Sequence, residues 1–599
     1  MVKEIEMLHV DGRKADHARF DDSERAKPEN RQRIHLPGSS SWMDEKRGGG
    51  ECVTEISKVL EENRARIARL CRGCDDILLR EMRLGNPGID CLLVYIETAV
   101  SNMMLADSVL GKLLNCLWEM DEGGISRAME ENGLGIADVK EFSELEAALD
   151  AMLAGNAVLF LDGYEKALKI GSKGYPGLGV SKAESEKVLR GSHEAFGESV
   201  KLNTALIRKR IRTTGLKVEE YFVGVRSNTV TALVYLEDLV RPGLPVRVRE
   251  ELQAFSIDAV QDSGFIEQLA GRFSWSPFPK FQVTERPDRA AAAVLEGRMV
   301  LLCDNSPAAL LLPTTLNSLM QTGDDYYGSF EIASFLRVIR YLSLALAFSL
   351  PGLYLAVTGF HPQLLPAALS FSLAQARTGV PFPGIVEVLF LEISFELLRE
   401  AGLRMPGPIG GTIGIVGGLI VGQAAVSANL VSPVVVVVAA MTALGSFSIP
   451  NEELSEAMRL LKYGMILLCG YFGLYGFVFG WILLLVHLSR LKSFEIPYLM
   501  PFAARSEDGI TPFTDGIFRG PLSWLAFRPV FTRSGARRRY VHFGEMSTDR
   551  RKYCRKNREQ EKGCMPYAGL KNRENACRKD TDDGDGRTGH GCGKNQQDR

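Results

Sequence analysis

The sequence predicts an α/β N-terminal region of two small subdomains, followed by an all-α membrane domain. Two observations carry this prediction. Short buried strands alternate with helical stretches through the first half of the chain. Between Tyr341 and His487 charged residues become sparse and long apolar runs appear. The overall share of hydrophobic residues, 46%, resembles that of a soluble protein only because the two halves are averaged.

Composition divides the chain into five parts. Residues 1–50 are polar and are expected to be disordered. Residues 51–213 and 214–332 are expected to form the first and second α/β subdomains, and residues 333–503 the helical membrane domain. Residues 504–599 form a basic tail with glycines and cysteines, expected to be disordered after residue 543. The first residues contain no apolar core of signal-peptide length, so the N-terminal region is not obviously secreted.

Four apolar runs predict strands in the two subdomains. They are Cys91–Glu97, Asn156–Gly163, Thr231–Asp238 and Arg298–Pro307. A helical pattern from Cys52 to Leu84 precedes the first of them. The first and third runs share one order: an apolar run, a tyrosine, an apolar residue and a glutamate. This similarity suggests an internal duplication without deciding it.

Polar motifs in the soluble half point to structure more than to chemistry. The basic stretch that ends with Arg208–Arg212 could suit nucleic acid, but a solvated or membrane-proximal face is favoured and no nucleic-acid partner is expected. Thr284 or Glu285 could start a helix whose first turn holds Pro287. No histidine or cysteine lies nearby to complete a nucleophile–base pair, so no enzymatic activity is expected.

The cysteines predict neither a disulfide framework nor a metal centre. Eleven are scattered along the chain, and Cys71 and Cys74 form a C-x-x-C without a second pair at zinc-ribbon spacing. Ordinary thiols are favoured over a zinc site there. A solvated tail is favoured over a metal site at Cys554, Cys564, Cys577 and Cys592. No cofactor or metal is expected.

Four segments are candidate membrane spans. They are Tyr341–Phe360, Gly410–Leu430, Pro433–Ile449 and Gly464–His487. Arg337 and Arg340 precede the first, and Arg490 and Lys492 follow the last. By the positive-inside tendency both flanks are cytoplasmic, which requires an even number of spans. The connection Asn451–Lys462 is expected on the outer side.

An acidic helix is expected between the first two spans. Glu392, Glu396 and Glu400 are spaced to share one helix face, and Arg399 and Arg404 are near enough to pair with them. Such a helix suits an interfacial or re-entrant position, because unpaired charge is expensive inside a bilayer. An interfacial helix held by its own salt bridges is favoured over a ring of carboxylates at a pore mouth.

A stripe of glycines follows the acidic helix. Gly410, Gly414, Gly418 and Gly422 recur at every fourth position, and Gln423 adds an uncharged polar group. Small residues on one face allow helix backbones to approach closely. The stripe therefore predicts tight helix packing, either inside one subunit or between subunits.

Several segments, in order, resemble the A-subunit family of bacterial spore germination receptors, the GerA family. The resemblance runs from about Glu184 to Pro529, and more weakly back to Cys91. It is carried by "LRGSHEAFGESVKLNTALIRKRIR", "FPKFQVTERPD", "VLEGRMVLLCDNSP", "DDYY", "VPFP", "FELLREAGLRMP", "GQAAVSANLVSP" and "IPYLMPFA".

The resemblance implies an integral protein of the endospore inner membrane with a cytoplasmic N-terminal region. It also implies partners, namely a transporter-like B subunit and a lipoprotein C subunit, and a response to small nutrients. A-type subunits are thought to oligomerise around an ion-conducting pore, which would make the glycine stripe and the acidic helix the channel-forming parts.

Three turns depart from the family pattern, at residues 191–196, 225–229 and 304–307. These departures leave open an accessory, sporulation-operon paralogue that acts as a membrane scaffold or channel. A solute transporter is less favoured, because the spans show no inverted repeat.

Overall fold

The computed structural model describes residues 55–84, 88–100, 139–174 and most of 182–539, with its larger gaps at 271–274, 405–417, 503–514 and 522–524. These residues belong to one compact unit, Ile56–Arg599. The predicted extension 1–50, the tail beyond 539 and the amphipathic stretch around residues 103–118 lie outside the described residues.

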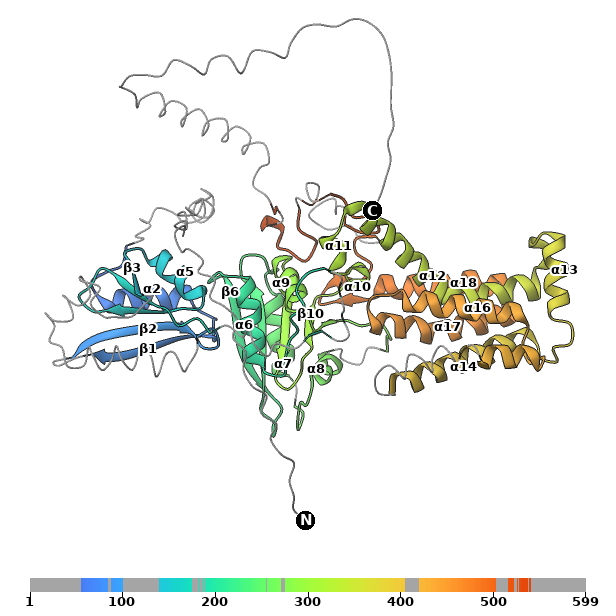
Figure 1. The fold of residues 1–599 in the computed structure, drawn as a ribbon, viewed down its shortest axis with the longest axis horizontal. Coiled ribbons are helices and arrows are strands. Elements are labelled where there is room, and N and C mark those ends of the chain that lie inside the picture. Colours follow the sequence, from blue (N-terminus) through green and yellow to red (C-terminus); the bar gives the residue numbers. More distant parts are fainter. Residues whose placement is uncertain are drawn as a thin grey trace, which may run out of the picture. The chain divides into compact units, whose positions relative to one another are not determined.

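The first α/β subdomain is an antiparallel five-stranded sheet with the strand order β1-β2-β4-β5-β3 (Figure 1). Helices α2 and α5 pack against one of its faces, where Ile67 and Met152 meet Val94 and Phe160 in a buried cluster. The predicted helix ends earlier than residue 84, because β1 begins at Ile77. The elements of the first subdomain are α2 (Leu60–Leu70), β1 (Ile77–Leu84), β2 (Ile89–Ile96), β3 (Val139–Phe142), α5 (Leu145–Leu153), β4 (Ala157–Leu161) and β5 (Ala167–Ile170).

The second α/β subdomain has the same topology, β6-β7-β9-β10-β8, again with antiparallel neighbours. Helices α6 and α9 pack on one face, and α7 and α8 on the other. Its elements are α6 (Val200–Arg210), β6 (Leu216–Val223), β7 (Thr229–Leu236), α7 (Leu244–Gln253), α8 (Ser263–Ala270), β8 (Gln282–Thr284), α9 (Pro287–Leu295), β9 (Met299–Cys303) and β10 (Ala309–Leu312). Because α6 packs here, this subdomain begins before residue 214.

The same local hydrogen bonds recur in both subdomains, so we call them the first and second repeats. Asn63 in α2 and Asn203 in α6 each bond both the N–H and the C=O of the residue six positions earlier. Asp162 and Asp304, which follow the equivalent strands β4 and β9, each accept a hydrogen bond from the first amide of the equivalent helix. The similarity of the two strand sequences therefore reflects a repeated topology.

The second half is a helical bundle in which α12, α14, α16, α17 and α18 pack against one another (Figure 1). In chain order, the elements outside the two repeats are α10 (Leu316–Met320), α11 (Asp324–Tyr327), α12 (Phe330–Phe360), η2 (Pro362–Leu364), α13 (Ala367–Ala376), α14 (Gly384–Arg404), α16 (Pro433–Phe447), α17 (Glu452–Phe472), α18 (Leu474–Arg490), β11 (Lys492–Ser493), β12 (Ile496–Pro497) and η3 (Ser534–Ala536).

Among the described residues, only α12 is both long and apolar enough to cross a membrane by itself; α13, α16 and α18 are shorter apolar helices. Four spans are therefore not confirmed. The predicted span Gly464–His487 is in fact the end of α17 and most of α18, separated by Gly473. This glycine has φ +57, a conformation that L side chains rarely adopt. The chain reverses direction at Gly473, but the residues on both sides are apolar, so the sequence read as one continuous span.

The acidic helix, α14, packs along α16 and α17; its interfacial or re-entrant position stays a prediction. One further expectation for the bundle is corrected. The supposed outer connection Asn451–Lys462 forms the first half of α17. There Leu454 and Ala457 share a buried cluster with Phe278 and Leu316, close to the second repeat.

Candidate functional site

Two glutamates of α14, Glu392 and Glu396, pair with basic side chains of α17. Glu392 Oε2 lies 2.6 Å from Lys462 Nζ, and both side chains are almost completely buried. Glu396 Oε1 lies 2.8 Å from Arg459 Nη1. At the next turn the basic residue is on α14 and the acidic residue is on α17: Arg399 Nη2 lies 3.3 Å from Glu452 Oε1. We call these three pairs the charge ladder.

The charge ladder follows from helical spacing on two antiparallel helices. Steps of three or four residues place the α14 members on one face, and steps of three and seven do the same on α17. Glu392 and Lys462 are both buried, so it would be expensive to leave either charge unpaired, and this pair favours one register of the two helices. The pairing is incomplete, however, since three buried atoms have no hydrogen-bond partner among the described residues: Glu392 Oε1, Arg399 Nη1 and Arg459 Nε.

Of the two arginines predicted to pair within α14, Arg399 pairs with Glu452 of α17 instead, and the side chain of Arg404 lies outside the described residues. Arg399 reaches α17, and its guanidinium also lies 5.9 Å from the ring centre of Phe447. Glu400 is exposed. Arg459 and Lys462 were not predicted as partners of these glutamates, although their three-residue spacing on one helix face was a usable signal.

A second buried carboxylate near the start of α14 was also missed. Glu387 is 1% exposed. Its Oε1 lies 3.0 Å from Arg377 Nη2, and its Oε2 accepts a hydrogen bond from the Ser432 amide, immediately before α16. Glu387 therefore joins α14 to the loop after α13 and to the start of α16.

The glycine stripe is only partly described. Gly410 and Gly414 lie outside the described residues. A Cβ at Gly418 would meet Phe395 of α14 at 3.5 Å, and one at Gly422 would meet Val436 of α16 at 3.4 Å. Both distances are ordinary van der Waals contacts within one subunit. Gln423 is exposed.

The closest helix approaches occur at other glycines. A Cβ at Gly476 would lie 2.1 Å from the Leu468 carbonyl oxygen, which fixes the α17–α18 hairpin. A Cβ at Gly445 would lie 3.0 Å from the Ser343 carbonyl oxygen, so α16 presses on α12 there. Gly352, Gly470 and Gly480 are similarly crowded by side chains. Gly476 and Gly480 are four residues apart, but the five glycines are spread over four helices and form no single stripe, so the sequence pattern did not reveal them.

A second ionic cluster surrounds the start of α12. Arg337 is 1% exposed, and its guanidinium bonds Asp325 at 2.9 Å and Asp515 at 2.8 Å. Arg340 also bonds Asp325, at 2.9 Å. Burial opposes ionisation of Asp325, but the hydrogen bonds and charges of Arg340 and Arg337 outweigh it, so its pKa lies below the usual range. The arginines predicted as a membrane flank thus tie α12 to α11 and to the segment after α18.

The basic stretch of α6 is likewise not a solvated face throughout. Arg208 is fully buried and bonds Asp76 of the first repeat through two nitrogens, at 2.8 and 2.6 Å. Cys71 and Cys74 lie buried beside this pair, and burial raises the pKa of the Cys71 thiol to about 12. No group of three or more metal-ligating side chains occurs among the described residues.

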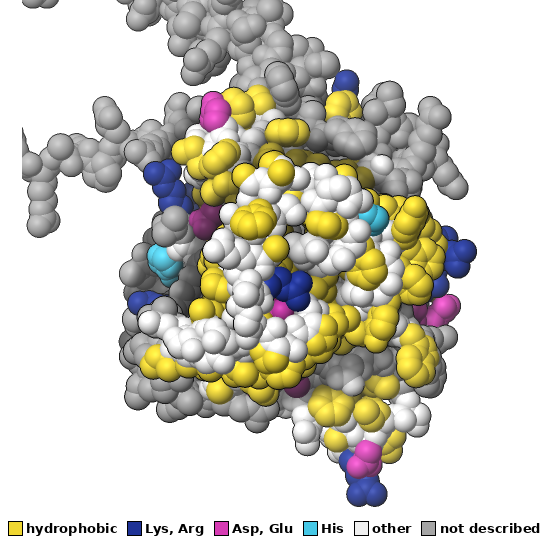
Figure 2. Space-filling view, turned by 90° about the vertical axis from the view of Figure 1, so that its right-hand side faces the viewer, with side chains coloured by type: hydrophobic (Ala, Val, Ile, Leu, Met, Phe, Trp, Pro, Cys, Tyr) yellow, Lys and Arg dark blue, Asp and Glu magenta, His cyan; other side chains and the backbone are white. Residues whose placement is uncertain are grey.

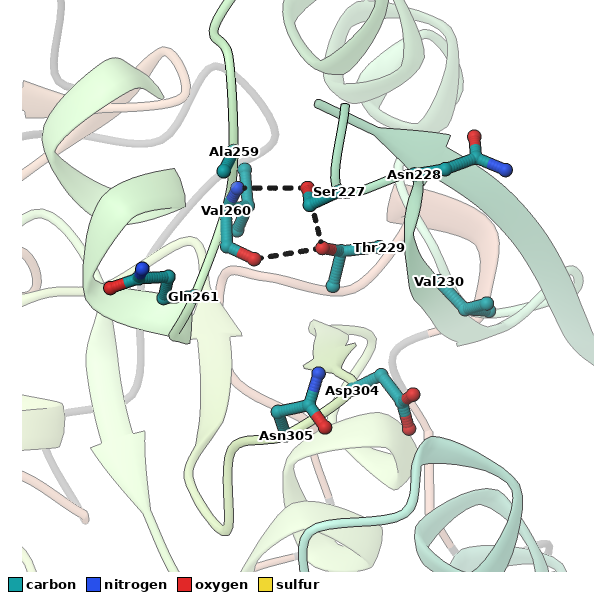
Figure 3. Close-up of a pocket in the computed structure, with 9 residues that line it drawn as sticks. All are labelled: Ser227, Asn228, Thr229, Val230, Ala259, Val260, Gln261, Asp304 and Asn305. Carbon is teal, nitrogen blue, oxygen red and sulfur yellow. Dashed lines mark hydrogen bonds between the residues drawn. The ribbon is translucent and has the colours of Figure 1, made fainter. Parts of the chain in front are cut away.

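The second repeat contains an open polar hollow of about 470 Å³ (Figure 3). On one side the Thr229 hydroxyl donates to the Val260 carbonyl, and the Val260 amide donates to Ser227. Asp304 and Asn305 line the other side from the turn after β9, with the Asp304 carboxylate turned towards the Val200 amide. Hydroxyls, amides and one carboxylate suit a small hydrogen-bonding solute better than an apolar one. Two of the three departures from the family pattern meet here.

The helical bundle carries a largely apolar surface. Figure 2 shows hydrophobic side chains over much of the end that carries α13, with few charged side chains among them. Exposed apolar side chains continue along the bundle, among them Leu397, Val437, Leu444 and Leu460. An apolar bundle joined to two polar α/β repeats defines a membrane protein with a large soluble region.

The particular family follows from comparison with known proteins. Residues 65–531 match the family described as "Bacillus/Clostridium GerA spore germination protein". The chain therefore belongs to the GerA family, as the resemblance predicted.

Named relatives agree with this assignment. The chain is 39% identical to "Uncharacterized membrane protein YfkQ" of Bacillus subtilis (strain 168), over 79% of this chain and 91% of that protein. It is 34% identical to "Spore germination protein GerLA" of Bacillus cereus, over 77% and 93%. It is 33% identical to "Spore germination protein KA" of Bacillus subtilis (strain 168), over 79% and 86%.

One solved structure is also similar in sequence. It is the N-terminal domain of the A subunit of the Bacillus megaterium spore germinant receptor GerK3, at 26% identity and a TM-score of 0.35, over 44% of this chain and 97% of that one.

Proposed function

We propose that this protein is the A-type subunit of a nutrient germinant receptor in the spore inner membrane, and that several copies form its ion-conducting part. In this proposal the soluble repeats are cytoplasmic, and the chain works with a transporter-like B subunit and a lipoprotein C subunit. Family membership and the spore germination relatives support the receptor role. The charge ladder is the single observation that supports conduction.

In this proposal the charge ladder is a gate with a paired state and a separated state. While α14 and α17 are paired, Glu392 and Glu396 are neutralised by Lys462 and Arg459. Separation of the helices would free the carboxylates to attract cations along a water-filled path. The buried atoms left without partners limit the stability of the paired state. A signal that favours the separated packing of α14 and α17 would therefore increase the fraction of molecules in the separated state.

The test is cation release from spores that carry Glu396→Gln. Loss of the carboxylate should slow nutrient-triggered release of potassium and sodium about five-fold, corresponding to ~1 kcal/mol on the barrier. Glu331→Gln is the matched control, because Glu331 is an exposed carboxylate in the first turn of α12; it should release cations normally. Immunoblots verify equal protein amounts.

The conduction proposal fails if Glu396→Gln and Gly414→Leu both leave cation release normal at wild-type protein levels. Normal release together with normal dipicolinate release would favour the accessory role for this chain.

A further inference from the structure

Trp275 is the most exposed large hydrophobic side chain among the described residues, at 98%. Its neighbours are nevertheless fixed to the end of α18. Ser276 Oγ lies 2.8 Å from His487 Nε2, within hydrogen-bonding distance. Phe278 is buried, and its ring centre lies 5.8 Å from that of His487. Trp275 therefore projects beside the last turn of α18.

The apolar surface of α18 ends at the same level. Before His487 the exposed side chains of this helix are aliphatic or aromatic: Tyr475, Val478, Phe479, Ile482, Leu483, Leu485 and Val486. After His487, Arg490 and Lys492 are exposed. Trp275 thus stands where an apolar band gives way to basic residues.

We propose that Trp275 inserts into the headgroup boundary of the lipid bilayer and anchors the second repeat to the membrane surface. This inference rests on the proposed membrane location of the protein and takes the apolar helix α18 to lie in the bilayer. An indole has an apolar body and one N–H donor, so it is stabilised where hydrocarbon meets hydrated headgroups. The Ser276–His487 contact holds the loop at that depth, and basic side chains beside it favour anionic lipids.

The test measures quenching of Trp275 fluorescence by brominated lipids. Full-length protein is reconstituted into phosphatidylcholine–phosphatidylglycerol vesicles whose acyl chains are brominated either near the headgroup or near the bilayer centre. The Trp275 signal is the difference between wild-type protein and Trp275→Phe. We expect shallow bromines to remove most of this signal and deep bromines to remove little.

Trp481 serves as a second probe, which tests the membrane placement of α18 independently of the position of Trp275. It lies in α18 against Phe348, six positions before His487, or about 9 Å deeper at 1.5 Å per residue. Its signal, obtained with Trp481→Phe, should respond more to the deep bromines than that of Trp275. If neither tryptophan is quenched, the membrane placement of α18 fails as well.

If Trp481 is quenched and Trp275 is not, the anchoring inference alone is overturned. Access of aqueous iodide to Trp275 would then indicate a side chain in water. Protection from both iodide and bromine would indicate that protein, such as a second copy of the chain, covers it.

Discussion

The two repeats share a topology and its local hydrogen bonds, but they differ in what surrounds them. In the second repeat α6 carries Arg208, which bonds the first repeat, whereas the equivalent position in α2 is Ala68. The segment after α18 also adds bonds to the second repeat, including Thr532 Oγ1 to the Glu296 carbonyl and the Arg533 amide to the Leu239 carbonyl.

One pair of glycines shows the difference directly. Gly155 and Gly297 occupy equivalent turns between a helix and a strand, with φ +91 and +83. At Gly297 a Cβ would also lie 2.8 Å from the Thr532 Cα, because the C-terminal segment presses on this turn. Local hydrogen bonds are thus common to both repeats, whereas contacts with the C-terminal segment are found in the second repeat.

The largest effect is expected at the junction between the repeats. Arg208→Ala leaves Asp76 buried without its partner, which should destabilise the protein by about 3–5 kcal/mol. Thermal unfolding of the detergent-solubilised full-length protein measures this change. Lys201→Met is the matched control: it removes an exposed ion pair with Glu97 across the same junction and should cost at most about 1 kcal/mol. Equal effects of the two substitutions would show that the junction does not depend on the buried pair.

A smaller effect is expected at the repeated asparagines. Asn63→Ala and Asn203→Ala each remove two hydrogen bonds to buried backbone and should each cost about 1–3 kcal/mol. Hydrogen exchange should accelerate in α2 for the first variant. For the second it should accelerate in α6 and also around Asp76, because α6 carries Arg208. Acceleration around Asp76 in both variants would contradict the proposed asymmetry.

The smallest effect is expected at the aspartates that cap the helices. Asp162→Ala and Asp304→Ala each remove an acceptor for the first amide of α2 or α6 and should cost about 0.5–2 kcal/mol. Asp304 is half-buried and Asp162 is exposed, so the cost should be larger in the second repeat. The unfolding midpoints of the two variants provide the comparison. A larger decrease in the midpoint for Asp162→Ala than for Asp304→Ala would contradict the prediction.

Much of the fold could be predicted from the sequence. The four apolar runs became β2, β4, β7 and β9, and the helix predicted at Pro287 begins there. Both kinds of signal are local: an apolar run bounded by turns, and a proline at the first helical position. The span Tyr341–Phe360 lies within α12, and its Pro351 is accommodated inside the helix.

The sequence by itself determined the strands β2, β4, β7 and β9, the apolar segment of α12 and the family, because each depends on neighbouring residues or on ordered motifs. Only the tertiary structure decided which charges meet. Glu392 and Lys462 are 70 residues apart, and Arg208 and Asp76 are 132 apart, so no local spacing specifies either pair. The reversal at Gly473 was decided in the same way. Both sides of that turn are apolar, and only packing of α17 on α18 distinguishes two helices from one.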